Sequence, residues 1–160
     1  MFTAVELSSS KQLAILLAED SDEDAFLFRH ALEASRLKAR LTRVCDGNEA
    51  MHYLQAKPPF SDRSEHPFPD MIVTDLKMPK ADGFDLLRWL KNNRTCGVIP
   101  TIVLSASFLE ADVVKAYELG ANAFLTKPSG VKELADLLLL TYMFWSHCQR
   151  PPPPAGFKCS

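Results

Sequence analysis

At 160 residues the chain is long enough for one domain with a substantial core, and its length requires no second domain. Its 18 basic and 20 acidic residues give a formal net charge of −2, which provides no electrostatic reason to expect a nucleic-acid partner. Its four cysteines form no CxxC pair and have no histidine at ligand spacing, which argues against a zinc site and a disulfide framework.

The two ends of the chain are predicted to lie outside the folded domain. Residues 1–11 lack the basic start and apolar core of a secretory signal, so we predict a flexible N-terminal lead and a cytoplasmic protein. Residues 149–160 contain four consecutive prolines, which favour an extended conformation and cannot continue a helix. We therefore predict a disordered, proline-rich tail after a domain that spans residues 12–148.

Short apolar runs of strand length alternate with longer segments of helical period, which is typical of βα units and a parallel sheet. The predicted strands are Leu13–Ala18, Leu41–Val44, Met71–Thr74, Thr101–Ser105 and Ala123–Leu125. The first predicted helix begins at Ser21 or Asp22, the second runs from Asn48 to Ala56, and the third follows Gly83. The fourth runs from Glu110 to a left-handed stop at Gly120, and the fifth begins near Ser129. Right-handed crossovers then give an α/β fold, a doubly wound five-stranded parallel sheet flanked by five helices.

A proline-rich stretch, residues 58–69, interrupts this alternation before the third strand. Loops of this length are uncommon in compact domains and are often functional or mobile. We predict a surface insertion, with a contact to a partner protein as the alternative. The nearby basic residues Arg36, Lys38, Arg40 and Arg43 form only a modest group, which is predicted to be a solvated face.

Polar side chains lie at the carboxyl ends of four predicted strands. Glu19 and Asp20 follow the first strand, Asp75 the third, and Lys127 the fifth, while Ser105 ends the fourth. In a doubly wound sheet these ends meet at one edge, where ligands bind. Each residue alone could be an ordinary polar loop residue, but all five together predict one shared pocket.

The chemistry of such a pocket favours a hard cation and a phosphoryl group. Carboxylates about 4 Å apart repel by roughly 1 to 4 kcal/mol per pair, so a positive partner is expected. Oxygen ligands that leave room for water and phosphate suit Mg²⁺. Asp75 beside Mg²⁺, the Lys127 ammonium and the Ser105 hydroxyl would have what a phosphate-accepting carboxylate requires, although a capping role is the commoner one for such a serine.

These residues resemble the receiver domains of two-component response regulators, over about Leu13 to Trp145. Glu19-Asp20 is similar to the family's acidic pair, and Asp75 opens its D-x-x-M-P-x-x-D-G signature. The segment from Gly120 to Pro128 resembles the family's G-A-x-x-[FY]-L-x-K-P pattern, which ends in a lysine-proline pair. The resemblance implies the flavodoxin-like topology of that family.

The resemblance also implies a mechanism in which a histidine kinase donates a phosphoryl group to Asp75. Mg²⁺ would be held by Asp20, Asp75 and the Lys77 carbonyl, with Glu19 binding directly or through water. Ser105 would then move toward the phosphoryl group, and the aromatic residue Phe124 would turn inward. The Lys127–Pro128 peptide bond would be cis. The protein is thus expected to be a phosphoacceptor in signalling rather than an enzyme with an external substrate.

The output is expected to be a protein contact, because no DNA-binding segment follows the fifth helix. The run Leu137–Trp145 is only about half of the roughly 20 residues that a membrane span needs, and it is too apolar for a helix with one buried face. We predict partial burial and a homodimer through the fourth and fifth helices, with kinase docking as the alternative. The inserted loop, the length and this helix resemble stand-alone regulators associated with phytochromes, which implies a light-sensing kinase.

Two other functions remain open at this point. A receiver-like domain could serve only as a binding scaffold without phosphorylation. Alternatively, Asp75 could be the nucleophile of a phosphohydrolase, although Lys77 stands where such enzymes have the second aspartate of a D-x-D motif.

Overall fold

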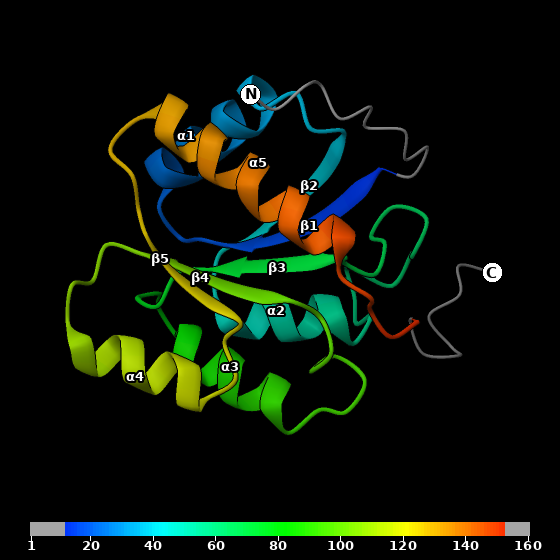
Figure 1. The fold of residues 1–160 in the computed structure, drawn as a ribbon. Coiled ribbons are helices and arrows are strands. Elements are labelled where there is room, and N and C mark those ends of the chain that lie inside the picture. The colour runs from blue at the N-terminus through cyan, green and yellow to red at the C-terminus, as the bar shows by residue number, and fades with distance from the viewer. Residues whose placement is uncertain (1–11, 153–160) are drawn as a thin grey trace.

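The computed structural model describes residues 12–152, and Figure 1 shows how strands and helices alternate along them. The strands are β1 (Leu13–Ala18), β2 (Ala39–Val44), β3 (Met71–Thr74), β4 (Thr101–Ser105) and β5 (Ala123–Thr126). The helices are α1 (Asp22–Ala34), α2 (Gly47–Leu54), α3 (Gly83–Lys91), α4 (Glu110–Glu118) and α5 (Val131–His147). The predicted N-terminal lead and most of the predicted tail, residues 153–160, lie outside the described residues.

All five strands are parallel and form one sheet in the order β2-β1-β3-β4-β5. The chain leaves β1 to form β2 on one side and then crosses back to form β3 on the other side of β1. In doubly wound sheets this change of direction is where ligands bind, beyond the carboxyl ends of the strands. The predicted fold is confirmed, and it places Glu19 and Asp75 just after two neighbouring strands.

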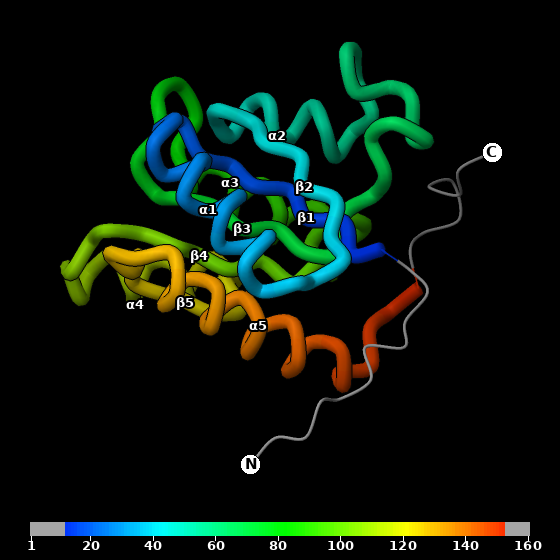
Figure 2. Tube along the Cα trace, turned by 90° about the horizontal axis from the view of Figure 1, so that it is seen from above, coloured from blue at the N-terminus to red at the C-terminus, as the bar shows by residue number. Residues whose placement is uncertain are grey.

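Alternation of side chains along the strands divides most of the core between the two faces of the sheet. Ile15 and Leu17 pack in one cluster with residues of α1 and α5, whereas Leu16 and Ala18 pack in another with residues of α2 and α3. A third, smaller cluster joins α3, α4 and β4. Figures 1 and 2 show the same division, with α1 and α5 side by side on one face and α2, α3 and α4 on the other.

The element boundaries differ from the predicted ones by a few residues, each for a local reason. β2 begins at Ala39, two residues before the predicted Leu41, because pairing with β1 already begins at Leu13 and Ala39. The second helix ends before the predicted Ala56, which has a left-handed φ of 55°. Gly120 has a φ of +96° just after α4 and confirms the predicted helix stop.

The proline-rich loop, residues 58–69, folds against the carboxyl-terminal end of α2. Arg63 donates from Nη1 to the Tyr53 carbonyl at 2.9 Å and from Nη2 to the Leu54 carbonyl at 2.8 Å. A second bond from Nη1 reaches the His66 carbonyl at 3.1 Å, within the loop. The bond to the Leu54 carbonyl satisfies an acceptor that a helix end leaves without an intrahelical partner, whereas the Tyr53 carbonyl also accepts from the Ala56 amide at 3.1 Å. The positive charge of Arg63 suits this end of the helix dipole.

The described start of the tail lies against the main domain, since Arg150 donates to the Asp70 carbonyl at 2.9 Å. Among the described residues, no helix has both the length and the apolar character needed to cross a bilayer. Cys45, Cys96 and Cys148 are free thiols, and Cys159 lies outside the described part of the chain.

Candidate functional site

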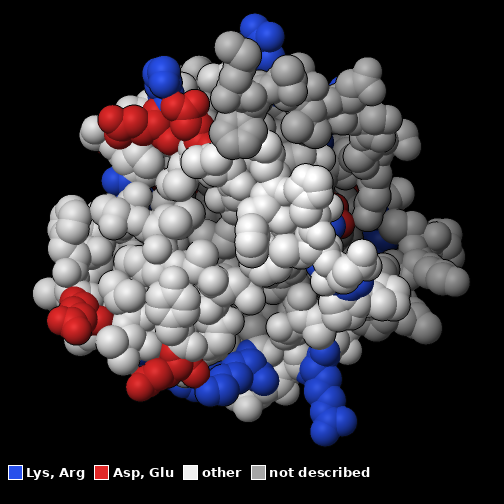
Figure 3. All heavy atoms as spheres, in the orientation of Figure 1, with Lys and Arg blue, Asp and Glu red and all other residues white. Residues whose placement is uncertain are grey.

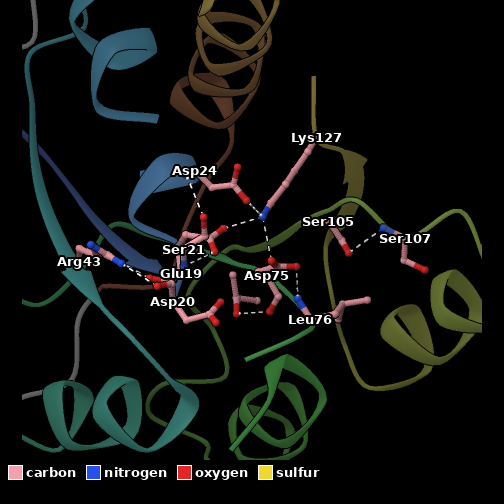
Figure 4. A network of polar contacts seen from close by, with 11 residues as sticks. Glu19, Asp20, Ser21, Asp24, Arg43, Asp75, Leu76, Ser105, Ser107 and Lys127 are labelled. Atoms are coloured by element: carbon pink, nitrogen blue, oxygen red, sulfur yellow. Dashed lines mark hydrogen bonds and ion pairs between the residues drawn. The ribbon is translucent and has the colours of Figure 1, made fainter. Parts of the chain in front are cut away.

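Three side chains from three different strand ends meet at one point, as Figure 4 shows. Lys127, just after β5, places its ammonium nitrogen 2.7 Å from Oε2 of Glu19, which follows β1. The same nitrogen lies 2.8 Å from Oδ2 of Asp75, which follows β3. These three residues were predicted to share a pocket, and the structure brings them together.

A third carboxylate, Asp24, also contacts this ammonium group, with Oδ2 at 2.6 Å from Lys127 Nζ. It comes from the first turn of α1, and carboxylate oxygens of Glu19, Asp24 and Asp75 all lie within 4.8 Å of one another. One ammonium group is therefore shared by three carboxylates. The site retains excess negative charge, which a further cation would balance.

Sequence reasoning missed Asp24, although the spacing Ser21-x-x-Asp24 was a usable signal. In a capping box the side chain at Asp24 would accept a hydrogen bond from the Ser21 amide. Here Ser21 caps α1 through its hydroxyl, but its amide donates to Glu19 Oε1 at 3.0 Å. The Asp24 carboxylate is thereby left available for Lys127.

The start of α3 has a complete capping box, whereas α1 has only the half in which the Ser21 hydroxyl accepts from the Asp24 amide. The Asp82 side chain accepts from the Asp85 amide at 2.9 Å, and the Asp85 side chain accepts from the Asp82 amide at 3.1 Å. Both helices thus begin with a polar residue followed by an aspartate three positions later. Only in α1 does the second carboxylate turn toward the site.

The backbone around Asp75 fixes the direction of its carboxylate. The Leu76 amide donates to Oδ1 at 2.6 Å, while Oδ2 faces Lys127. Gly83, the last residue of the D-x-x-M-P-x-x-D-G signature, approaches this turn so closely that an added Cβ would lie 2.1 Å from the Asp75 carbonyl oxygen. A glycine is therefore required there for the loop to hold Asp75 in this position.

Burial and ion pairing change the proton affinities of two groups at the site. Glu19 is 4% exposed, and this burial raises its pKa above the ordinary value of 4.5 despite the hydrogen bonds from Lys127 and the Ser21 amide. Burial acts to lower the pKa of Lys127, but hydrogen bonds to Asp24, Asp75 and Glu19 outweigh it and raise that pKa. The lysine is therefore fully charged at neutral pH.

The other predicted metal ligands, Asp20 and Lys77, are both exposed at this edge of the sheet. In Figure 4 the Asp20 side chain points toward the side of the site where Asp75 lies, although it is not part of the close carboxylate group. Oxygen donors alone, with one ammonium group among several carboxylates, form a donor set that suits a hard divalent cation such as Mg²⁺. The residues present therefore fit the implied metal.

The two predicted switch residues do not contact Asp75 in this structure. Ser105 is buried, and its hydroxyl oxygen accepts a hydrogen bond from the Ser107 amide at 3.1 Å. Phe124 packs against the cluster of α3, α4 and β4, and its amide donates to the Tyr117 hydroxyl at 3.2 Å. Ser105 lies near Asp75 and Lys127 in Figure 4, whereas Phe124 is a partly buried residue of β5 that packs on the core, and the predicted movements of both stay predictions.

The predicted cis bond between Lys127 and Pro128 is wrong for this structure. Among the described residues the cis peptide bond joins Pro58 and Pro59. The trans form is the intrinsically favoured one for an X-Pro bond. With it the Lys127 amide donates to the Ser105 carbonyl at 2.9 Å while the side chain still reaches all three carboxylates.

Comparison with known proteins identifies the family of this chain. Residues 15–139 match the family model for the response regulator receiver domain. The chain is 36% identical over 137 residues to the response regulator Rcp1 of Synechocystis sp., which covers 86% of this chain and 91% of that protein.

Two solved structures share the fold. The phosphorylated cyanobacterial phytochrome response regulator RcpA superposes with a TM-score of 0.79 at 32% identity, covering 89% of this chain and 100% of that one. The Mn²⁺-bound form of Rcp1 gives a TM-score of 0.74 at 35% identity, covering 88% of this chain and 99% of the other. The match of the family model to most of the chain, together with the site geometry, shows that this protein belongs to the response regulator receiver domain family.

Proposed function

We propose that this receiver domain accepts a phosphoryl group on Asp75 from the phosphohistidine of a histidine kinase, with Mg²⁺ bound at the same site. The observation that carries the proposal is the placement of Asp75 Oδ2 at 2.8 Å from Lys127 Nζ, beside Glu19 and Asp24. A carboxylate nucleophile beside a fixed positive charge has the arrangement that phosphoryl transfer requires.

In the proposed reaction an Asp75 carboxylate oxygen attacks the phosphorus of the phosphohistidine. A new P–O bond forms, the P–N bond breaks, and its electron pair returns to the imidazole nitrogen, which takes up a proton. Lys127 would balance charge on the phosphoryl oxygens, since its ammonium group is held in place before the reaction begins. The Leu76 amide keeps the Asp75 carboxylate oriented toward this side.

The Mg²⁺ ion would be held by Asp20, Asp75 and the Lys77 carbonyl, with Glu19 binding directly or through water. When bound, Mg²⁺ neutralises charge on the phosphoryl oxygens and on the carboxylates. Support for a divalent cation comes from the excess of carboxylates over ammonium groups here. The relative Rcp1 is known in a Mn²⁺-bound form.

The proposed signal is a change in the surface around α4 and β5. Ser105 would exchange its bond with the Ser107 amide for one to the phosphoryl group. Ser107 itself bonds to Asp112 at the start of α4 at 2.5 Å, so a shift of this loop would reach that helix. Phe124, tied to α4 through Tyr117, would turn inward in response.

Time courses of phosphorylation by acetyl phosphate with Mg²⁺ test the proposal. Wild type should gain one phosphoryl group, whereas Asp75→Asn should remain at background. Asp62→Asn, an exposed position in the proline-rich loop, is the matched control and should behave as wild type. Equal labelling of Asp75→Asn would overturn the proposal, and absence of labelling with no effect of Mg²⁺ on the protein would favour the binding scaffold. Multiple turnover of a small phosphate ester would instead favour the phosphohydrolase.

We further infer that the face formed by α4, β5 and α5 carries a homodimer interface. Leu140 and Phe144 of α5 are 62% and 64% exposed, and Val114 and Tyr117 of α4 are 48% and 50% exposed. Figure 3 shows this face with a largely uncharged centre and its charges toward the edges. Exposed apolar area of this kind is typical of a protein contact.

Phe144→Glu should shift the protein from dimer to monomer in sedimentation experiments. Phe26→Glu provides a matched control, because Phe26 on α1 is also 64% exposed but lies outside this face. A monomeric wild type, or equal effects of the two substitutions, would exclude this interface.

A phytochrome-type histidine kinase in the cytoplasm is the proposed phosphodonor. Support comes from the structural likeness to RcpA, which is itself a cyanobacterial phytochrome response regulator. Phosphotransfer from candidate kinases of the same genome tests this assignment. Faster transfer from a kinase without a light-sensing domain would contradict it.

A further inference from the structure

Arg43 on the edge strand β2 lies against the loop that joins β1 to α1. The residue pairs in register with Leu17, so its side chain is level with the end of β1. Sequence reasoning placed it on a solvated face, but its side chain is only 23% exposed and turns inward to the loop. The register between β1 and β2 causes this difference, because it sets Arg43 directly beside the acidic residues.

The guanidinium group of Arg43 spans the acidic loop with three separate donors. Nε donates to the Glu19 carbonyl at 2.9 Å, and Nη2 donates to the Asp20 carbonyl at 3.0 Å. Nη1 forms an ion pair with Asp22 at 2.7 Å. Figure 4 shows Arg43 on the side of this loop opposite Lys127.

We infer that Arg43 is a positioning residue for metal binding, which fixes the backbone of the acidic loop so that Glu19 and Asp20 face Asp75. This inference rests on the proposed function. Arg43 binds the backbone carbonyls of the two residues and not their carboxylates. The carboxylates therefore stay available for the cation, while the loop that carries them is held.

The chemistry of arginine suits this role better than that of lysine. Its planar group presents several N–H donors in a rigid fork, so one side chain can hold two carbonyls and a carboxylate together. The ion pair with Asp22 contributes little by itself, because Asp22 is 93% exposed and solvent screens the interaction. The two bonds to the carbonyls of Glu19 and Asp20 are the contacts that carry the inference.

Charge and position predict opposite effects when Arg43 is replaced. Arg43→Gln removes a positive charge near a cation site, so electrostatics alone would strengthen Mg²⁺ binding. Loss of the fixed loop would weaken it, and groups that orient metal ligands typically account for 10- to 100-fold in metal affinity. We expect the positional effect to dominate and the Kd for Mg²⁺ to rise about tenfold, the low end of that range.

The test measures Mg²⁺ binding by calorimetry on the full chain for wild type, Arg43→Gln and Arg43→Lys. Arg43→Lys keeps the charge but loses the fork, so its Kd should also rise. Lys38→Gln, an exposed change of equal charge on the segment before β2, is the control and should leave the Kd unchanged. For the two Arg43 variants, the rate of labelling by acetyl phosphate should be below the wild-type rate at low Mg²⁺ and should approach it at saturating Mg²⁺.

A merely structural role would lower the melting temperature without changing the Mg²⁺ affinity of the folded protein. Weaker binding by the Arg43 variants, with Lys38→Gln unchanged, supports the inference. Equal or tighter binding by these variants overturns it and leaves the proposed function intact. If wild type binds no Mg²⁺, both are overturned. Should Arg43→Gln fail to fold, Arg43→Lys decides by the same criteria.

Discussion

The two ends of the sheet are each organised around one cationic side chain, but the acceptors differ. Where the strands end, Lys127 contacts the carboxylates of Glu19, Asp24 and Asp75. Near the start of β3, Arg63 contacts the backbone carbonyls of three residues, two at the end of α2 and one in the proline-rich loop. Both groups join segments that are distant in the sequence.

The difference lies in the charge that remains after these bonds are made. Carbonyl groups are neutral, so the contacts of Arg63 leave no excess negative charge and serve to hold the loop. Three carboxylates around Lys127 leave an excess that one ammonium group does not balance. A network that still attracts a cation is suited to metal binding and phosphoryl transfer, whereas bonds from a cation to neutral carbonyls hold a loop without creating a cation site.

The largest expected effect is on phosphorylation when Lys127 is replaced. Lys127→Met should slow labelling of Asp75 by about 100- to 1000-fold, the usual result of removing a preorganised group that stabilises transition-state charge. Arg63→Met should leave the rate within about twofold of wild type, because Arg63 lies far from the reacting atoms. Rates from acetyl phosphate at saturating Mg²⁺ measure both. A comparable loss of labelling rate in Lys127→Met and Arg63→Met would contradict the assignment of phosphoryl transfer to the Lys127 end of the sheet alone.

Lys127→Met and Arg63→Met should also differ in their free energy of unfolding. Without Mg²⁺, Lys127→Met should lower the free energy of unfolding by about 3 kcal/mol, since it leaves partly buried carboxylates without their positive partner. Arg63→Met should lower it by about 2 kcal/mol, because the Leu54 and His66 carbonyls lose the hydrogen bonds from Arg63.

Mg²⁺ should reduce the loss of unfolding free energy in Lys127→Met relative to wild type, because a bound cation replaces the missing positive charge. It should not change the deficit of Arg63→Met. Urea unfolding with and without Mg²⁺ measures these differences. Equal recovery of both variants would show that the acidic site is not the place where the ion acts.

A smaller effect is expected from Asp24, the carboxylate that sequence reasoning missed. Asp24→Asn should weaken Mg²⁺ binding by about 1 kcal/mol, or roughly fivefold, because the site loses one nearby negative charge. Glu23→Gln is the matched control, since Glu23 belongs to the same helical turn but is exposed. Calorimetric titration of both variants would show whether Asp24 matters by position or only by charge. A similar loss in the control would leave no special role for Asp24.

The smallest effect concerns the pH dependence of stability through Glu19. Because the pKa of Glu19 is raised in the folded protein, the folded state holds this proton more tightly than the unfolded state does. The metal-free wild type should therefore lose stability, relative to Glu19→Gln, as pH rises from about 4.5 through the pKa in the folded state. We expect the loss to be small, because the hydrogen bonds from Lys127 and the Ser21 amide oppose the effect of burial on this pKa.

Urea unfolding of wild type and Glu19→Gln across this pH range checks whether the wild type loses stability relative to the variant as pH rises. A difference that does not vary with pH would mean that burial of Glu19 has no net effect on its ionisation.

The fold and the meeting of the site residues could be predicted because they depend on patterns that a sequence displays. Apolar runs at regular intervals indicate parallel strands, and topology then places Glu19, Asp75 and Lys127 at one edge. Their distances in the structure agree with that expectation.

The remaining features depend on competition or register that a sequence does not display. Asp24 reaches Lys127 only because Glu19 takes the Ser21 amide that would otherwise complete a capping box. Arg43 reaches the acidic loop only because β1 and β2 pair in one register. The proline-rich loop was predicted as an insertion, but the contacts that Arg63 makes with the end of α2 depend on the folded path of the loop.

The most direct test of Asp75 as phosphoacceptor is the location of the phosphoryl group after reaction with acetyl phosphate and Mg²⁺. Intact-mass measurement followed by peptide mapping of the full chain provides it. We predict one added phosphoryl group, on the peptide that contains Asp75. A phosphoryl group on any other residue, or no mass change in a folded protein that binds Mg²⁺, would contradict the assignment.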